Sequence, residues 1–251
     1  MMMTSKFQFS VCSHDVAKDM ASWSSLNMYL QKNLGCDLRF EPRDDFDQEL
    51  EAVLQGSHHL VYASPYSAIV FAKRLGFIPL AKPVDSFDET LVIARKDFVL
   101  TNAREVKIAV ASSQMIVHVL GLMLLRRMNL SLERCDFDFV GTHANAAHAV
   151  THSADLAFVY HDTWSDLTDA ARNTLQIVAQ TDSRLAFHCF CVAPEWQDKR
   201  ERLQGVLCGM QNDFHGKSIL GDLHVHGFEP LAADALEPLN QVFEELGITP
   251  E

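Results

Sequence analysis

The stretch that most constrains the fold is HHLVYASPYSAIVFAKRLGFIPLAKPV, residues 58–84. It opens with a short, largely apolar run of the kind found in strands that are covered on both faces. Ser64 can cap a helix, Pro65 suits its first position and Gly76 suits its end. The pattern therefore predicts a strand, a helix and a second strand. The turn at 64–67 would lie at the carboxyl end of a parallel strand, where open α/β sheets bind anions and small polar ligands.

The rest of the chain continues this alternation of strands and helices with short links. Such alternation predicts an α/β protein with parallel sheets that carry helices on both faces. Two blocks of this kind predict two Rossmann-like lobes, joined by a two-strand hinge near 89–96 and 185–192. We place residues 1–92 and 190–251 in the first lobe and residues 93–189 in the second, with a ligand cleft between them.

The expected elements follow from the same patterns. In the first block they are strands 7–13, 37–42, 58–63 and 77–83 and helices 20–34, 45–55 and 65–75. In the second block they are strands 106–111, 136–140, 155–160 and 175–180 and helices 114–129, 143–152 and 163–172. The tail should add helix 195–214, a helical turn near 216–222 and a helix at 231–246 packed back on the first lobe.

Composition and charge limit the classes of partner that the chain can bind. The net charge of −12, from 21 Lys and Arg against 33 Asp and Glu, argues against a nucleic-acid partner, which needs a basic face. A small anion stays compatible, because helix N-termini can hold it in an acidic protein. No stretch reaches the roughly 20 apolar residues of a membrane span, so we expect no membrane insertion. The start MMMTSKFQFSV lacks a signal peptide pattern, which predicts a cytoplasmic protein as sequenced, or a periplasmic one if the N-terminus was trimmed.

Seven segments in this order and spacing carry a resemblance to a known family. They are FQFSVCSHD (7–15), ASWSSLNMYLQKNLG (21–35), the stretch 58–84, ETLVIARKD (89–97), VKIAVASSQ (106–114), FDFVGTHANAAHAV (137–150) and ADLAFVYHD (154–162). The chain resembles the phosphate/phosphite/phosphonate-binding proteins of ABC transporters, a branch of the type II periplasmic binding proteins. The resemblance implies that fold, and a solute-binding protein that closes about its hinge on a small oxyanion or a related polar ligand. It also implies an ABC permease or a sensor as partner.

Four loops and one strand end are the candidate ligand-binding segments. The loops offer hydroxyls or backbone N–H groups at the starts of helices, which are the donors that a tetrahedral oxyanion needs. The candidate ligand-binding residues are His14, Ser64, Tyr66, Ser67, Ser112, Ser113, Gln114, Thr142, His143 and Tyr160.

Some of these residues match the family pattern and others depart from it. The family has a Ser/Thr-rich run that ends in Gly; Ser112 and Ser113 match it, whereas Gln114 does not. A His of the family pattern corresponds to His143, which would add a charge-assisted hydrogen bond to the oxyanion when protonated. In the family, an Asp that can bind the amino group of aminoalkyl phosphonates occupies the position of Tyr160. We therefore expect weak or no binding of 2-aminoethylphosphonate.

Two other function classes stay open. One is a cytoplasmic enzyme that reuses the same cleft, and the other is a ligand-sensing subunit. The sequence has no G-x-S-x-G elbow, and no catalytic residue is predicted. Cys12 lies near His14, but a Cys12 side chain directed into the sheet would belong to the core.

Cysteine and histidine spacing bears on metal binding. The six cysteines lack C-x-x-C spacing and have apolar neighbours, which is typical of buried thiols. Cys189 and Cys191 share one face of a predicted strand, so a soft-metal pair is the alternative there. His224-x-His226 has a spacing that strands use for metals, but no third ligand is evident nearby. Twelve histidines keep a zinc or iron site open as an alternative, although the sequence lacks H-E-x-x-H, paired cysteines and an Asp/Glu cluster at a cleft loop. We predict no metal and no cofactor.

Overall fold

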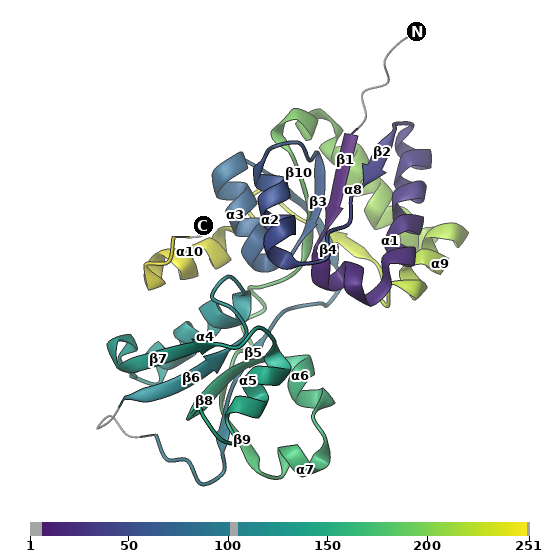
Figure 1. Ribbon diagram of the computed structural model, residues 1–251. Coiled ribbons are helices and arrows are strands. Elements are labelled where there is room, and N and C mark those ends of the chain that lie inside the picture. The colour runs from purple at the N-terminus through teal and green to yellow at the C-terminus, as the bar shows by residue number, and fades with distance from the viewer. Residues whose placement is uncertain (1–6, 101–104, 250–251) are drawn as a thin grey trace. The chain divides into compact units, whose positions relative to one another are not determined.

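Residues 7–100 and 105–249 are described by a computed structural model, in which they form two compact units (Figure 1). Within that description, unit 1 comprises residues 7–86 and 187–238, and unit 2 comprises residues 87–186 and 239–249. The chain passes from one unit to the other after Ser86, Ala186 and Pro238. Each unit has its own sheet, which confirms the predicted two-lobed α/β class.

Unit 1 is built on a six-stranded sheet in the order β11-β4-β10-β3-β1-β2. In chain order its strands are β1 (Phe7–Val11), β2 (Leu38–Phe40), β3 (Leu60–Ala63), β4 (Ile78–Pro83), β10 (Cys189–Val192) and β11 (Phe228–Pro230). Strands β1, β2 and β3 are parallel, and β10 is antiparallel to β3 and β4. The carboxyl ends of β1 and β3 and the beginning of β10 therefore share one edge of the sheet.

Helices cover both faces of this sheet (Figure 1). Phe9, Tyr62 and Phe190 pack in one cluster with side chains of α1 and α8, such as Trp23 and Leu203. Alternate residues of the same strands are buried on the other face, beneath α2 and α3. The helices are α1 (Ser13–Leu34), α2 (Phe46–Leu54), α3 (Pro65–Leu75), α8 (Arg200–Gly209) and α9 (Phe214–Asp222), with 3-10 turns at Pro194–Lys199 and Met210–Asn212.

The stretch 58–84 folds as its residues predict. All of β3 is buried, and the Ser64 hydroxyl accepts a hydrogen bond from the N–H of Ser67 at the start of α3. Pro65 is the first helical residue, where its missing N–H costs no hydrogen bond. Gly76 ends α3 in the left-handed conformation with φ of 72°.

Unit 2 is built on a five-stranded sheet in the order β7-β6-β8-β5-β9. Its strands are β5 (Thr90–Arg95), β6 (Val106–Val110), β7 (Cys135–Phe139), β8 (Leu156–Tyr160) and β9 (Leu175–Gln180). Strands β7, β6 and β8 are neighbours and parallel, whereas β5 is antiparallel to β8 and β9. Three consecutive parallel strands therefore end at the same edge of this sheet.

Helices also pack on both faces of the unit 2 sheet. On one face α4 lies so close that a Cβ atom at Gly121 would be 2.2 Å from Cδ2 of Phe158. On the other face, Ala146 of α5 packs with Ala157 and Val159 of β8. The helices are α4 (Ile116–Arg127), α5 (His143–Ala149), α6 (His161–Asp166), α7 (Asp169–Arg172) and α10 (Glu237–Leu246), with a 3-10 turn at Leu132–Arg134.

The C-terminal helix differs from the prediction. A helix at 231–246 was expected on the first lobe, but β11 stays in unit 1 while residues 239–249 pack in unit 2. Arg126 of α4 donates hydrogen bonds to the last carbonyls of α10, those of Glu245 and Leu246. Phe243 is fully buried. Elsewhere the chain changes unit at 86/87 and 186/187, slightly earlier than the expected 92/93 and 189/190.

Other helices also differ in extent. The predicted helix 195–214 is divided into α8 and the two 3-10 turns on either side of it. Helix α1 begins at Ser13 rather than at 20, because a first helical segment precedes Asp19. Asp19 leaves the helical conformation, and its carboxylate accepts a hydrogen bond from the N–H of Ser22 at 3.1 Å. This internal cap marks the start that the sequence predicts. The helix expected at 163–172 is divided into α6 and α7, since the Thr168 hydroxyl caps a new helix. In the described part of the chain, no helix combines the length and apolar character that crossing a bilayer requires.

Candidate ligand-binding site

The carboxyl edge of the unit 2 sheet brings together six of the residues that the sequence predicts for ligand binding, five after strand ends and one at a strand end. Strands β6, β7 and β8 end there, and polar segments follow each of them. Those residues are Ser112, Ser113, Gln114, Thr142 and His143, and Tyr160 is the last residue of β8. Parallel strand ends with polar loops are where open α/β sheets bind ligands.

The loop after β6 forms a turn before helix α4. The Ser112 hydroxyl accepts a hydrogen bond from the N–H of Gln114 at 3.2 Å, and α4 begins at Ile116 rather than at the expected 114. Met115 precedes the helix without a side-chain cap. Ser113, in the same turn, is exposed.

The loop after β7 is ordered by a helix cap. The Thr142 hydroxyl accepts a hydrogen bond from the N–H of Asn145 at 3.0 Å. His143 is half-buried at the first position of α5, and its ring lies 6.4 Å from the ring of Tyr160 at an angle of 35°. His143 and Tyr160, predicted from separate strand ends, are therefore near neighbours.

Asp88 is a residue of this edge that the sequence reasoning missed. Its carboxylate accepts a hydrogen bond from the Tyr160 hydroxyl at 3.3 Å, and Asp88 is only 6% exposed. Thr90 pairs with Tyr160 in the sheet, which brings the segment before β5 to the end of β8. No local pattern indicates this contact, because it depends on the strand order of the sheet.

The unit 1 candidates differ in exposure. Ser64, Tyr66 and Ser67 are 8%, 4% and 0% exposed. The Ser64 hydroxyl accepts from the N–H of Ser67 and donates to the Ser67 hydroxyl at 3.1 Å, so both serines are used in the cap of α3. His14 is exposed in the first turn of α1, where its ring stacks on Phe46 at 6.0 Å.

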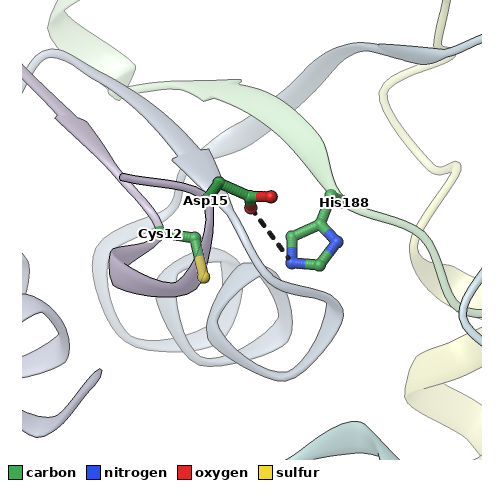
Figure 2. Close-up of side chains that lie close together, drawn as sticks. All are labelled: Cys12, Asp15 and His188. Atoms are coloured by element: carbon green, nitrogen blue, oxygen red, sulfur yellow. Dashed lines mark ion pairs between the residues drawn. The ribbon is translucent and has the colours of Figure 1, made fainter. Parts of the chain in front are cut away.

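A second group of polar side chains gathers at the edge of the unit 1 sheet where β1 and β3 end and β10 begins. Cys12, Asp15 and His188 each offer one ligand-type atom, and these three atoms lie within 4.8 Å of one another (Figure 2). The imidazole Nε2 of His188 is 3.6 Å from a carboxylate oxygen of Asp15. Burial raises the pKa of the Cys12 thiol well above its ordinary value, and the charges of Asp15 and Glu49 raise it further.

Glu49 lies inside unit 1 near this group. It is fully buried on the inner face of α2, and neither carboxylate oxygen has a hydrogen-bond partner among the residues that the structure describes. Burial raises its pKa to about 8, with a further contribution from the charge of Asp15. A buried acid without a partner is costly unless it stays protonated or meets a cation.

Among the described residues, the other metal candidates from the sequence gather no third ligand. Cys189 and Cys191 do share a strand face, and their sulfur atoms are 3.5 Å apart. Within residues 7–100 and 105–249, Cys12, Asp15 and His188 make up the one close group of three possible metal ligands. His224 and His226 belong to no such group in that part of the chain.

Comparisons with known proteins give a family and a fold. The family model described as ABC transporter, phosphonate, periplasmic substrate-binding protein matches residues 9–236. No curated protein sequence matches the chain. Among solved structures, XAC2383 from Xanthomonas citri bound to chloride ion superposes with a TM-score of 0.79 at 19% identity, covering 97% of this chain and 98% of that one.

Two further structures share the fold. PhnD1 from Prochlorococcus marinus, in complex with methylphosphonate, gives a TM-score of 0.75 at 11% identity over 98% of this chain and 100% of that one. The periplasmic aliphatic sulphonate-binding protein SsuA from Escherichia coli gives 0.68 at 14% identity over 98% and 94%. These likenesses confirm the predicted periplasmic binding protein fold.

Proposed function

This chain belongs to the family of periplasmic substrate-binding proteins of phosphonate ABC transporters, and on that premise we propose that it binds a small tetrahedral oxyanion at the carboxyl edge of the unit 2 sheet. The observation that carries this proposal is the convergence of three strand ends, of which β6 and β7 are followed by hydroxyl and N–H donors. Several donors without a bulky cation suit a phosphonate or phosphate group.

The turn at 112–114 supplies the central donors in this proposal. Ser113 is exposed, and the hydroxyl of Ser112 accepts from the N–H of Gln114 while its own proton stays available for donation. The N-terminus of α4 directly after the turn favours negative charge. His143 adds a ring nitrogen from the neighbouring strand end, and Thr142 holds that loop in place.

The unit 1 candidates divide into two groups by exposure. His14 is the exposed member of its set and stays a predicted ligand contact. Ser64 and Ser67 act by holding the start of α3, because their hydroxyls are engaged with each other and with the backbone. Tyr66 is 4% exposed, and we assign it to the same supporting role.

The contact between Tyr160 and Asp88 bears on which oxyanion is bound. An aminoalkyl phosphonate needs an acidic group for its ammonium, and the Asp88 carboxylate is buried and already accepts from Tyr160. We therefore propose that an uncharged substituent, such as the methyl group of the methylphosphonate found with PhnD1, is preferred over 2-aminoethyl. A transporter permease is the corresponding partner.

The enzyme alternative gains no support from Cys12. A nucleophilic cysteine needs a lowered pKa, whereas burial and two nearby carboxylates raise the pKa of this thiol. The predicted closure of the lobes on the ligand and the location of the chain in the cell stay predictions.

Isothermal titration of the purified protein with four ligands tests the proposal. The ligands are methylphosphonate, inorganic phosphate, sulfate and 2-aminoethylphosphonate, in one buffer free of competing anions. We expect saturable one-site binding of methylphosphonate or phosphate, and weaker binding of 2-aminoethylphosphonate. Absence of heat with every tetrahedral anion would contradict the proposal.

A further inference from the structure

We propose that Cys12, Asp15 and His188 of unit 1 form a site for a divalent transition metal ion, with zinc as the best fit. Thiolate, carboxylate and imidazole are the three ligand types that zinc takes in proteins. This site belongs to unit 1, and the proposal does not rest on the proposed function.

The fold brings the three side chains together from two distant parts of the chain. Cys12 directly precedes α1, and its carbonyl accepts the N–H of Asp15 at 2.9 Å, so one helical turn separates the two side chains. His188 precedes β10, which pairs with β3 next to β1. The His188 ring stacks on Tyr62 at 5.8 Å and 15°, which limits its rotation.

The distances are close to those of a tetrahedral site. Bond lengths of about 2.0–2.3 Å at zinc place neighbouring ligand atoms roughly 3.3–3.7 Å apart. The separation of 3.6 Å between Asp15 and His188 already falls in this range, and all three atoms lie within 4.8 Å. Rotation of the Asp15 side chain closes the rest, and a fourth position stays open to water.

Burial and access both suit a bound ion. Cys12 is fully buried, whereas the side chains of Asp15 and His188 are 17% and 25% exposed, so an ion enters from their side. Lys18 lies 3.8 Å from the other Asp15 oxygen, but its side chain is 75% exposed and such a pair is weak.

The buried Glu49 is the second observation that points to a cation. This carboxyl group interacts with the charges of both Asp15 and Cys12, yet it has no hydrogen-bond partner among the described residues. A cation bound near Glu49 would give this buried carboxyl group the partner that the described residues do not provide. We assign Glu49 a positioning role behind the ligands.

Binding replaces one proton with the metal ion. The Cys12 thiol loses its proton to solvent, and the thiolate sulfur donates an electron pair to the ion. The single negative charges of the thiolate and of Asp15 then balance the two positive charges of zinc, and the neutral His188 imidazole adds no charge. The same thiolate explains the choice of metal, since hard ions such as magnesium and calcium prefer all-oxygen sites.

Metal titration of the full chain tests this site. Chelator-stripped protein is titrated with zinc against a chromophoric competitor, and with cobalt(II) as a spectroscopic probe. We expect one equivalent of tightly bound zinc, and a thiolate-to-cobalt charge-transfer band. Cys12→Ser and His188→Gln should each weaken zinc binding more than the roughly 10- to 100-fold loss that outer-shell changes produce, and Glu49→Gln should fall within that loss.

Matched controls come from the same unit. Cys36→Ser and His215→Gln change a half-buried cysteine and an exposed histidine outside the group, and they should leave zinc affinity unchanged. Wild-type binding that survives Cys12→Ser, or that is lost in a control variant, would overturn the assignment. If Cys12→Ser does not fold, the cobalt spectrum of the wild type still decides, because a spectrum without the thiolate band excludes Cys12 as a ligand.

Discussion

The hydroxyl of Tyr160 donates a hydrogen bond to the carboxylate of Asp88, with 3.3 Å between the two oxygen atoms. This bond joins the end of β8 to the segment before β5 across 72 residues of sequence. It also places a buried acid beside Tyr160, at the edge where we propose that the ligand binds.

Loss of this hydroxyl should destabilise unit 2. In Tyr160→Phe the buried Asp88 carboxylate loses a donor, and we expect the free energy of unfolding to fall by about 1–3 kcal/mol. Urea unfolding of both proteins measures the difference. Asp166→Asn, at an exposed position of the next helix, should stay within about 0.5 kcal/mol of the wild type. Equal effects of the two changes would contradict this reading of the bond.

His118 should lower the free energy of unfolding at acidic pH. Burial lowers the pKa of His118 to about 4, among the rings of Phe137, Phe139 and Phe158. Below the ordinary pKa of 6.5 the unfolded chain takes up a proton that the folded protein refuses, so the free energy of unfolding falls as pH drops from 6.5 to about 4.

His118 alone can change the free energy of unfolding by at most about 1.4 kcal/mol per pH unit. His118→Phe should remove this slope, whereas the exposed His148→Gln should keep it. Denaturant unfolding at several pH values measures both slopes. An unchanged slope in His118→Phe would show that the imidazole is protonated in the folded state.

Gly121 and Gly205 should respond to alanine in opposite directions. Helix propensity alone predicts that alanine stabilises both positions. At Gly121 a Cβ atom would meet the ring of Phe158 at 2.2 Å, so Gly121→Ala should cost about 1–3 kcal/mol. At Gly205 the space is open, and Gly205→Ala should gain about 0.4–1 kcal/mol. Thermal unfolding shows whether each variant is more or less stable than the wild type. Stabilisation by Gly121→Ala would mean that α4 lies farther from β8.

Arg126 should hold the end of α10 in place. Its guanidinium donates to the carbonyls of Glu245 and Leu246, which have no helical partners of their own at a helix end. Arg126→Ala should speed hydrogen exchange of the α10 amides, whereas Arg127→Ala, equally exposed and next in sequence, should not. Equal exchange in both variants would remove Arg126 from this role.

Local signals explain which parts of the fold the sequence predicted. Ser64, Pro65 and Gly76 determine the ends of α3 by their own backbone and side-chain chemistry, and α3 has the predicted bounds. The position of α10 depends instead on which unit offers partners for its buried face. Leu239, Val242 and Phe243 would suit an apolar surface of either unit, so the pattern could not choose between them.

In the candidate sites, too, features set by local sequence were predictable and contacts between distant segments were not. The loops after β6 and β7 were predictable, because strand ends can be located from hydrophobic runs. The contacts of Asp88 with Tyr160 and of Asp15 with His188 depend on strand order and on antiparallel pairing. Nothing in the spacing of Cys12, Asp15 and His188 along the chain indicates that they meet.

Calorimetric titration of methylphosphonate into the wild type and into Ser113→Ala/His143→Ala tests the central claim most directly. Each lost hydrogen bond to a charged group costs about 1.5–3 kcal/mol, so the double variant should bind at least roughly 100-fold more weakly. The control, Ser165→Ala/His148→Ala, changes two exposed residues of the same types in unit 2 and should keep the wild-type affinity. Equal affinity in the wild type and in Ser113→Ala/His143→Ala would contradict the proposed site.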